Sequence, residues 1–582
     1  MNQEQLEQLR HSLAHLLAAA VLKIRPEAKR TIGPAIDNGF YYDFEFAEPL
    51  TQADLPKIEK QMKKMLTTWK SFDKHEVSAA EAKKEFADNP YKLELINEFA
   101  GEGQNLTIYQ SGDFRDLCRG GHAENFNKID PASFKLEKVA GAYWRGSEKN
   151  TMLTRIYGLA FATKQELDDY LAMKAEAEKR DHKKLGPALD LFTFSELVGS
   201  GLPLWTPKGT ILRNLLDDFV WELRKKYGYE KVEIPHITKK DLYETSGHWD
   251  KFQDDLFKIT TREGHLFAMK PMNCPHHTQI YARRAWSYRD LPQRYATTTM
   301  CYRDEQSGEL AGLSRVRGFA QDDAHVFCRL GQVKKEFLKI WDIIHAFYGV
   351  FGFNLRIRVS VHDPEQPEKY LGDKKKWEFA ESMLNEIVNE KKADTFLGVG
   401  EAAFYGPKLD FMGKDSLGRE WQVATIQIDM NMPERFDLNC TNEEGKAERV
   451  VMVHAAIMGS IERFLSIIIE HFAGEFPLWL SPVQVKIINV GEVHEDYCQK
   501  LADQLKAENI RVELDLANET VGNKIRKSSR EKIPYTLVIG DKEMQADKLA
   551  IRVRGQENLA ELSYDDFITN IKNSINNRSA EL

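Results

Sequence analysis

The hydrophobic positions of the N-terminal part predict a domain of mixed helices and strands. The stretch RHSLAHLLAAAVLKI has the spacing of an amphipathic helix. In RTIGPAIDNGFYYDFEF, which follows, aromatic residues flank Asn38-Gly39, a strong signal for a β-hairpin. Helical patterns return near 54–69 and 79–86, and strand-like, glycine-rich sequence follows. These patterns indicate an α+β domain over residues 1–163.

A charged helix and two further domains are predicted after it. QELDDYLAMKAEAEKRDHKKL indicates a solvated connecting helix over 164–185, ended by Gly186-Pro187. Residues 186–480 form the largest predicted domain. Over residues 481–582 the predicted strands are VQVKIINV, RVELDL, PYTLVIG and LAIRVR, and they alternate with helices near 496–508, 520–532 and 564–576. That alternation predicts an open α/β sheet covered by helices, so the whole chain is α+β and multidomain.

Length and composition agree with this organisation. A chain of 582 residues is too long for one core and corresponds to about four domains of typical size. Its 42% hydrophobic and 29% charged residues are ordinary for a globular protein. The longest uninterrupted apolar stretch, 16–22, is far short of the ~20 residues of a membrane span, and the N-terminus lacks a signal pattern. We therefore expect a soluble, cytoplasmic protein with no membrane association.

Charge and cysteine content exclude little else. The net charge of −8 is small for this length, so it does not indicate a polyanionic partner, although local basic surfaces can still exist. The six cysteines, at 118, 274, 301, 328, 440 and 498, lack the spacing of a disulfide framework. This favours buried thiols in a reducing compartment, with metal ligation or catalysis reserved for a minority.

Three phrases of the largest domain carry the first indication of chemistry. KKYGYEKVEIPHI predicts a helix running into a strand that carries Pro235, and CYRDEQSGELAGLSRVRGFAQDDAHVF predicts a strand, a polar loop and a returning strand. HAAIMGSIERFL predicts a helix with Gly459 before Glu462-Arg463. Together and in this order they resemble motifs one, two and three of the class II aminoacyl-tRNA synthetases. The resemblance implies an antiparallel-sheet catalytic core and, through motif one, a homodimer.

The arginines of these motifs suit adenylate formation, in which negative charge builds up on the α-phosphate of ATP. Fixed guanidinium groups and Mg²⁺ stabilise such charge without reorganising. The resemblance implies that Arg303 binds the α-phosphate, that Glu305 and the following loop receive the adenine, and that Arg315 reaches the γ-phosphate. Phe319 and Arg463 would sandwich the adenine ring. One Arg-x-Glu alone is more often a surface ion pair, but the whole set favours the site.

Further phrases narrow the resemblance to the threonyl-tRNA synthetase family over nearly the whole chain. They are MKPMNCPHH, RVRGFAQDDAHVF, FYGPKLDF, GREWQVATIQID and MVHAAIMGSIERF. The resemblance implies one zinc ion per subunit, held by Cys274, His325 and His454, with an open fourth position where threonine chelates through its amine and hydroxyl. Valine has no hydroxyl, so such a site would reject it. Taken singly, a buried Cys or His is more often a packed core residue.

The resemblance assigns further residues to the substrates. The residues that would orient threonine are Gln321, Asp323 and Tyr405. Those that would lie around ATP are Gln422, Thr425 and Lys408. His248, in SGHW, is similar to a histidine that the family uses when the terminal hydroxyl of the tRNA attacks the adenylate. His276 stands where the family usually has glycine, and both a competing metal donor and a packing role are open for it.

The N-terminal domain carries a second constellation. Serine keeps the hydroxyl of threonine and lacks one methyl group, worth about 1–3 kcal/mol of discrimination, so a second selective step is expected. His11 and His15 lie at i and i+4 of the first helix, and Cys118 and His122 repeat that spacing in DLCRGGH. On spacing alone this set suggests a four-ligand zinc site. The alternative is that these histidines only pack beneath the helix and bind nothing.

The resemblance of this constellation is to the synthetase editing domain, where the same cluster hydrolyses Ser-tRNA without an evident metal. Two further residues match positions of that pocket: Tyr42 and Asp116. Family members often begin with a small ubiquitin-like domain, and we expect this chain to lack it, because only ten residues precede the histidine motif.

The last segment resembles the anticodon-binding domain of the family. NKIRKSSREK places five basic residues within 524–532, which suits phosphate contacts, although a solvated helix face is an equal alternative. Asn518, Glu543 and Arg552 match base-reading positions. Lys532 replaces an arginine of the family, so that contact is in doubt.

The sequence therefore predicts a ligase that uses ATP and Mg²⁺ to join L-threonine to tRNA(Thr) and that hydrolyses Ser-tRNA(Thr). Two alternatives are less favoured by the sequence. A non-catalytic tRNA-binding regulator on a synthetase scaffold should have lost Arg303, Arg315 and Arg463, and all three are present. A stand-alone editing hydrolase would have no use for a ligase-like domain of about 300 residues.

Overall fold

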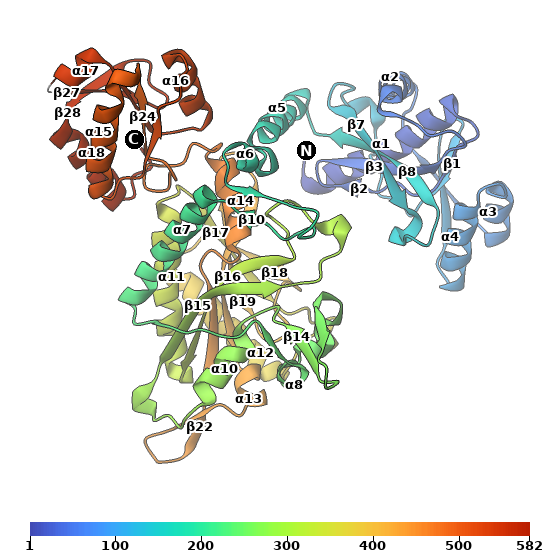
Figure 1. The fold of residues 1–582 in the computed structure, drawn as a ribbon. Helices are drawn as coiled ribbons and strands as arrows, with labels where there is room; N and C mark the ends of the chain where they lie inside the picture. Colours follow the sequence, from blue (N-terminus) through green and yellow to red (C-terminus); the bar gives the residue numbers. More distant parts are fainter. Residues whose placement is uncertain (547) are drawn as a thin grey trace. The chain divides into compact units, whose positions relative to one another are not determined.

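The computed structural model describes residues 1–546 and 548–582 and divides into two compact units, Met1–Ala175 and Glu176–Leu582 (Figure 1). Each unit has its own hydrophobic core. No helix within the described ranges is long and apolar enough to cross a membrane.

The first unit is built on helix α1 (Gln3–Ile24), which lies in blue in Figure 1. The side chain of Asn2 caps it by accepting a hydrogen bond from the Gln5 N–H at 2.8 Å. Its residues Leu9 to Val21 pack against a five-stranded sheet and against α2 (Leu55–Leu66). The strands are β1 (Lys29–Arg30), β2 (Ala35–Ile36), β3 (Gly39–Glu45), β7 (Phe134–Tyr143) and β8 (Met152–Ala160).

The predicted hairpin is confirmed, with its turn one residue earlier than expected. Ile36 pairs with Gly39, so the two turn residues are Asp37 and Asn38, and Asn38 has a φ of 62°. Asparagine tolerates this left-handed conformation better than most residues. Gly39 instead serves a close approach, because a Cβ there would lie 2.0 Å from the carbonyl oxygen of Gly158 on β8.

A second, three-stranded sheet completes the first unit. It contains β4 (Asp73–Val77), β5 (Leu106–Ser111) and β6 (Phe114–Leu117), with helices α3 (Ala79–Glu85) and α4 (Pro90–Gly101). Helix α4 corrects the sequence analysis, which predicts strand-like structure for this stretch. It starts at Asn89, whose side chain accepts a hydrogen bond from the Lys92 N–H, followed by Pro90 in the first turn. This N-cap and proline were the available start signals.

The connecting segment is two helices, which corrects the prediction of a single one over 164–185. Helix α5 (Lys164–Arg180) ends before Asp181, and α6 (His182–Ala188) begins directly after it. Asp181 has non-helical dihedral angles, and its side chain accepts a hydrogen bond from the Lys183 N–H at 2.9 Å. The break therefore comes from an N-cap, and Gly186-Pro187 lie inside α6 instead of ending the helix.

The second unit contains an eight-stranded sheet in the order β11-β15-β16-β23-β20-β19-β17-β18. These strands are β11 (Glu230–Lys231), β15 (Gln293–Tyr302), β16 (Gly318–Cys328), β17 (Leu355–Val361), β18 (Thr395–Val399), β19 (Lys408–Lys414), β20 (Glu420–Asp429) and β23 (Val451–Ala456). All neighbours are antiparallel except the pairs at the two edges. Helices α7 (Pro207–Lys226), α11 (Val333–Gly349) and α14 (Ile461–His471) pack on it through the largest core. The predicted antiparallel core is thus confirmed.

Two motif predictions need adjustment. Pro235 is not in a strand, because β11 ends at Lys231 and the last backbone bond to the sheet is donated by Val232 to Ala296 at 3.0 Å. Proline has no N–H to donate, which suits a segment that leaves a sheet. Gly459 lies in the loop between β23 and α14, with a φ of 66°, and the helix begins after it.

The predicted C-terminal α/β sheet is confirmed. Its order is β25-β24-β26-β27-β28, with β24 parallel to β25 and β26. The elements are β24 (Val485–Asn489), α15 (Glu495–Ala507), β25 (Val512–Asp515), α16 (Val521–Arg530), β26 (Tyr535–Ile539), α17 (Asp541–Gln545), β27 (Lys548–Val553), β28 (Leu559–Ser563) and α18 (Tyr564–Asn576).

Candidate active site and editing pocket

Two adjoining cavities of about 510 and 580 Å³ open on one face of the eight-stranded sheet. Predicted residues that line the first are Arg303, Glu305, Arg315, Phe319, Gln321, Gln422, Thr425 and Arg463. Those that line the second are His248, Cys274, Asp323, Tyr405, Lys408 and His454, together with shared walls formed by Arg303, Gln321, Gln422 and Thr425. The structure therefore brings together residues of motifs two and three, whereas no described residue of the motif-one phrase lines either cavity.

Strand periodicity explains much of this convergence. Side chains two apart on a strand point to the same face, and β16 carries Phe319, Gln321, Asp323 and His325 in this way. Across the β16–β23 ladder, His325 lies opposite His454.

The loop 303–317 between β15 and β16 carries the arginines of motif two. The Arg303 guanidinium lies 5.2 Å from the centre of the Phe319 ring. Arg315 donates to Glu305 at 2.7 Å and to Glu309 at 2.9 Å, and its side chain is about half exposed. Arg315 is therefore held at the cavity by carboxylates of its own loop.

Arg463 is in the first turn of α14. Its backbone N–H donates to the side chain of Ser460, which caps the helix. Burial lowers the pKa of its guanidinium, and no ion pair joins it to a carboxylate in the described part of the chain. A guanidinium with free donors facing a cavity is suited to an anionic ligand.

Asp410, which the sequence did not single out, organises the wall between the cavities. Its buried carboxylate accepts hydrogen bonds from Gln422 at 2.8 Å and Thr425 at 2.9 Å, and it pairs with Lys408 at 2.9 Å. Arg358 also donates to it, at 2.9 Å. The available signal was its place two residues after Lys408, on the same face of β19.

A candidate metal centre lies at the second cavity. Cys274 is the first residue of α10 (Cys274–Ala282), and its sulfur lies within 4.8 Å of one ring nitrogen each of His325 and His454. His325 Nε2 and His454 Nδ1 face each other at 3.1 Å. The other ring nitrogen of His325, Nδ1, lies 2.8 Å from His277 Nδ1. The other ring nitrogen of His454, Nε2, lies 3.0 Å from Asp429. Two imidazoles and one thiol, each imidazole oriented from behind, fit a zinc ion with one open position.

Two neighbours of this centre refine the sequence hypothesis. His277, which was not predicted, is the residue that contacts His325. His276 is not part of the donor group. Its ring is buried, and it packs edge-on against Tyr243 with 6.4 Å between ring centres, which agrees with the packing alternative.

The rest of the second cavity offers oriented polar groups. The Tyr405 hydroxyl donates to Gln427 at 2.8 Å, and its ring stacks on His454 with 5.0 Å between centres. The buried His248 contacts Ser246 through Nδ1 at 2.8 Å, while its Nε2 has no hydrogen-bond partner among the described residues. Burial lowers the pKa of His248 to about 3, so its imidazole is neutral at pH 7.

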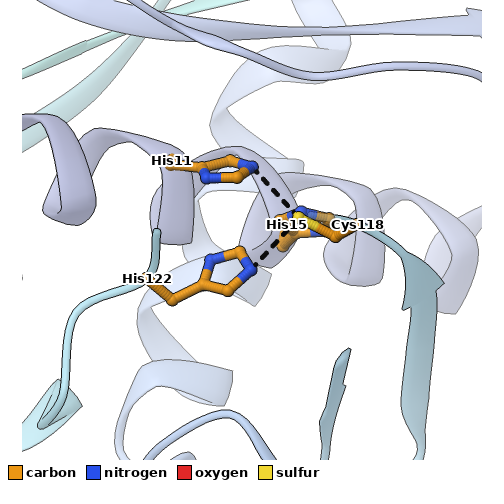
Figure 2. Close-up of side chains that lie close together, drawn as sticks. All are labelled: His11, His15, Cys118 and His122. Carbon is orange, nitrogen blue, oxygen red and sulfur yellow. Dashed lines mark hydrogen bonds between the residues drawn. The ribbon is translucent and has the colours of Figure 1, made fainter. Parts of the chain in front are cut away.

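In the first unit, the three predicted histidines and the cysteine converge on one point (Figure 2). His11 and His15 come from α1, Cys118 follows β6, and His122 lies in the loop after it. The Cys118 sulfur lies 3.5 Å from His11 Nε2 and 3.3 Å from His122 Nε2. Their donor atoms all lie within 4.8 Å of one another.

Behind this cluster lies a charged network that the sequence revealed only in part. The buried Asp116 faces His15 Nδ1 at 3.3 Å and accepts a hydrogen bond from Tyr42 at 2.5 Å. It also pairs with Lys92 at 2.8 Å and Arg30 at 3.1 Å. Lys92 and Arg30 were missed, because only the fold brings α4 and β1 to this pocket.

The network sets the charges of the cluster. Burial lowers the pKa of His15, but its interactions with Asp116 and Cys118 outweigh burial and raise it to about 9. Burial raises the pKa of Cys118, but hydrogen bonds with His11, His122 and His15 lower it to about 3. Burial lowers the pKa of His122 to about 4, although Cys118 opposes this. At neutral pH the pocket therefore holds an imidazolium at His15, a thiolate, and a neutral His122.

The predicted base-reading residues lie on three separate segments of the C-terminal domain. Asn518 is exposed in the loop after β25, and Arg552 is exposed on β27. Glu543, in α17, accepts a hydrogen bond from the Gly540 N–H at 2.9 Å. The basic stretch of α16 is less available than predicted: Lys524 is buried and donates to Asn489 at 2.5 Å. Its burial follows from the inward face of an amphipathic helix.

The antiparallel sheet and the arginine-bearing motifs over it define a class II aminoacyl-tRNA synthetase. Residues 257–472 match the "tRNA synthetase class II core domain (G, H, P, S and T)", 484–574 the "Anticodon binding domain", and 106–157 the "Threonyl and Alanyl tRNA synthetase second additional domain". The chain is 48% identical to a threonine–tRNA ligase of Cytophaga hutchinsonii, covering 97% of this chain and 88% of that protein. It is 47% identical to one of Deinococcus radiodurans, covering 98% and 89%. The chain therefore belongs to the threonine–tRNA ligase family.

Solved structures agree. The structure is similar to the RNA binding domain of threonyl-tRNA synthetase from Cryptosporidium parvum Iowa II, with a TM-score of 0.65 and 36% identity over 68% of this chain and 98% of that chain. A putative threonyl-tRNA synthetase from Aeropyrum pernix gives a TM-score of 0.61 and 30% identity over 69% and 97%. A prolyl-tRNA synthetase from Cryptosporidium parvum shares the fold alone, at 16% identity, 68% and 77% coverage and a TM-score of 0.53.

Proposed function

We propose that this protein activates L-threonine with ATP, transfers it to the 3′ end of tRNA(Thr), and hydrolyses Ser-tRNA(Thr). The observation that carries the proposal is that two cavities share a wall, one lined by Arg303 and Arg463 and the other by the Cys274–His454 donor pair. ATP and threonine must meet at such a wall, because the carboxylate of the amino acid attacks the α-phosphate.

In the first cavity the guanidinium groups bind the nucleotide. Arg303 lies at the shared wall and is assigned to the α-phosphate, where charge builds up in the transition state. Arg315 is assigned to the γ-phosphate and Glu305 to the adenine, which requires Arg315 to exchange its carboxylate partners for phosphate oxygens. Phe319 and Arg463 are assigned to the two faces of the adenine. ATP would enter with Mg²⁺, which neutralises phosphate charge.

In the second cavity Cys274, His325 and His454 would hold one zinc ion per subunit. Bound zinc would supply a Lewis-acidic position that takes the amine and hydroxyl of threonine and rejects valine. Gln321, Asp323 and Tyr405 line this cavity or its shared wall and would orient the amino acid.

His248 is assigned to the transfer step. It lines the second cavity, its ring is neutral, and its Nε2 is free of hydrogen bonds among the described residues. A neutral imidazole nitrogen can accept the hydrogen bond of the attacking tRNA hydroxyl. Lys408, Gln422 and Thr425 stay fixed around the phosphate through their contacts with Asp410.

The pocket of the first unit would hydrolyse Ser-tRNA. The neutral His122 can accept a proton from water, whereas His15 is protonated and acts as a donor or a positive charge. Because Asp116 holds His15 as an imidazolium, His15 can act as a proton or hydrogen-bond donor in a direct hydrolysis of the ester.

The remaining parts of the proposal concern the whole chain. We assign 1–163 to editing, 164–185 to the linker, 186–480 to catalysis and 481–582 to anticodon binding, where Asn518, Glu543 and Arg552 would contact bases. A homodimer and a cytoplasmic location complete the proposal. All six cysteines are free thiols in the structure, as is usual in a reducing compartment.

Threonine-dependent exchange of pyrophosphate into ATP, measured across the amino acids, tests the ligase function. We expect exchange with threonine, weaker exchange with serine and none with valine. Deacylation of preformed Ser-tRNA(Thr) tests editing: we expect the double variant His11→Ala/His15→Ala to lose it while threonine activation is unchanged. His75→Ala, an exposed histidine on β4, is the matched control. Exchange that ignores threonine would overturn the ligase function, and equal deacylation by all three proteins would overturn editing.

A further inference from the structure

His182, which no step above uses, fastens the loop 303–317 to the core. It is the first residue of α6, and its side chain is buried. Its Nδ1 lies 2.6 Å from Glu470 Oε1, and its backbone N–H donates to the same oxygen at 3.1 Å. On the other side of the ring, the Leu313 backbone N–H donates to Nε2 at 3.0 Å.

These partners determine where the proton of the ring lies. Burial opposes ionisation of Glu470, but hydrogen bonds from His182 and Arg419 outweigh it and lower the pKa of Glu470. A carboxylate only accepts, so Nδ1 of His182 carries the proton. The Leu313 N–H needs a lone pair, so Nε2 carries none. A neutral imidazole therefore bridges a carboxylate and a backbone amide.

The residues around this bridge are tightly packed. Leu313 is fully buried. Gly312 has a φ of 56°, and a Cβ there would lie 2.3 Å from His182 Nε2. The Ala311 N–H donates to the Arg315 carbonyl at 3.1 Å, so residues 311–315 form one closed turn. Any displacement of Leu313 would therefore move Arg315.

The other end of the bridge leads to the second guanidinium. Glu470 is in the last turn of α14, and Arg463 is in the first turn of the same helix. Although Asp181, His182 and Glu470 lie close enough for a cation, both ring nitrogens are already engaged, and Glu470 Oε2 pairs with Arg419 at 2.6 Å. The cluster is therefore a mechanical link and not a metal site.

We propose that His182 is a positioning residue for adenylate formation, which locks the loop 303–317 onto α14 so that Arg315 and Arg463 face the bound ATP together. The inference rests on the proposed ligase function. It requires that loss of the link weakens ATP binding and leaves threonine binding, in the second cavity, nearly unchanged.

Two substitutions separate the two sides of the ring. In His182→Asn, the side-chain amide can take the place of Nδ1 and keep Glu470, but nothing reaches the position of Nε2. In His182→Gln, the carbonyl oxygen can reach that position and accept from Leu313, while the backbone N–H of residue 182 still donates to Glu470 on α14. In pyrophosphate exchange we expect His182→Asn to raise KM for ATP about 5- to 20-fold, with KM for threonine within about twofold. His182→Gln should recover most of the loss.

Amide hydrogen exchange of the full-length protein provides a readout independent of activity. We expect faster exchange at Leu313 in His182→Asn than in His182→Gln. Equal changes in the two KM values, a lower Tm without a change in KM for ATP, or no recovery in His182→Gln would each overturn the proposal. If His182→Asn does not fold, Gly312→Ala, which crowds Nε2, should show the same selective rise in KM for ATP. A wild-type protein without threonine-dependent exchange would overturn the ligase function itself, and unchanged protection at Leu313 would overturn the link alone.

Discussion

At the scale of single residues, several charged side chains that line the cavities of the second unit have a defined partner within the protein. Asp410 is the clearest case, because one fully buried carboxylate holds three residues of the cavity walls. Arg303 and Arg463 are exceptions, since neither has a carboxylate partner in the described part of the chain. The difference separates side chains that build the site from the two guanidinium groups that are available to an anionic ligand.

Asp410→Asn should therefore impair the activation of threonine, although the side chain of residue 410 does not contact the substrate. An amide keeps the shape but leaves Lys408 without its negative partner, and its NH₂ group opposes the donors of Gln422 and Thr425. We expect kcat/KM in pyrophosphate exchange to fall about 10- to 100-fold. Asp437→Asn, an exposed carboxylate in the same unit, is the control. Wild-type kinetics in Asp410→Asn would show that the wall is held by packing alone.

Arg463→Ala should abolish adenylate formation and leave the fold intact. The change removes a stacking surface and a positive charge from the first cavity, for which a loss of about 10²–10³ in exchange rate is expected. Circular dichroism and the Tm should stay near those of the parent, because the guanidinium makes no ion pair within the described residues. Exchange close to wild type would refute the assignment of motif three.

At the scale of elements, each site depends on segments that are distant along the chain. The donor group at the second cavity needs the start of α10 and the register between β16 and β23. We expect one zinc ion per chain, lost in Cys274→Ala, because the thiolate is its softest donor. Cys498→Ala, a buried thiol of the C-terminal sheet, should keep the metal. Stoichiometric metal that survives loss of both Cys274 and His454 would point to the cluster in the first unit.

Helix α4 gives an element-scale test of the editing pocket. Asn89 caps the helix at Lys92, and Lys92 neutralises Asp116. Asn89→Ala should destabilise the helix start by about 0.5–2 kcal/mol and slow Ser-tRNA deacylation, with threonine activation unchanged. Ser78→Ala, which removes the cap of α3 and touches no pocket residue, is the matched control. Equal deacylation by the two variants would show that α4 does not position the pocket.

At the scale of the whole molecule, motif one predicts an obligate homodimer. Strand β11 is at the edge of the eight-stranded sheet, and Ile237, shortly after Pro235, is 49% exposed. An edge strand with exposed apolar neighbours can pair with a second copy, and a two-fold contact uses one surface twice. Sedimentation should give twice the 67.0 kDa chain mass at micromolar concentration. An active monomer under those conditions would contradict this prediction.

The sequence by itself determined the helices and strands with strong periodicity and the residues that lie within a single motif. The i, i+4 pair His11–His15 and the alternate positions Gln321, Asp323 and His325 share a face because local backbone geometry requires it. The departures were also local in origin: the N-cap at Asp181 divided the linker helix, and the cap at Asn89 started a helix in a stretch read as strand.

Only the tertiary structure decided which distant residues meet. Lys92 and Arg30 reach Asp116 from α4 and β1, Asp410 gathers the cavity wall, and His182 joins α6 to the loop 303–317. Apart from the place of Asp410 on the same face of β19 as Lys408, these contacts leave no periodic trace, because folding alone brings a buried charge or imidazole to its partner. Burial makes such partners obligatory, since an unpaired polar group in the interior is costly, but it does not say along the chain where the partner lies.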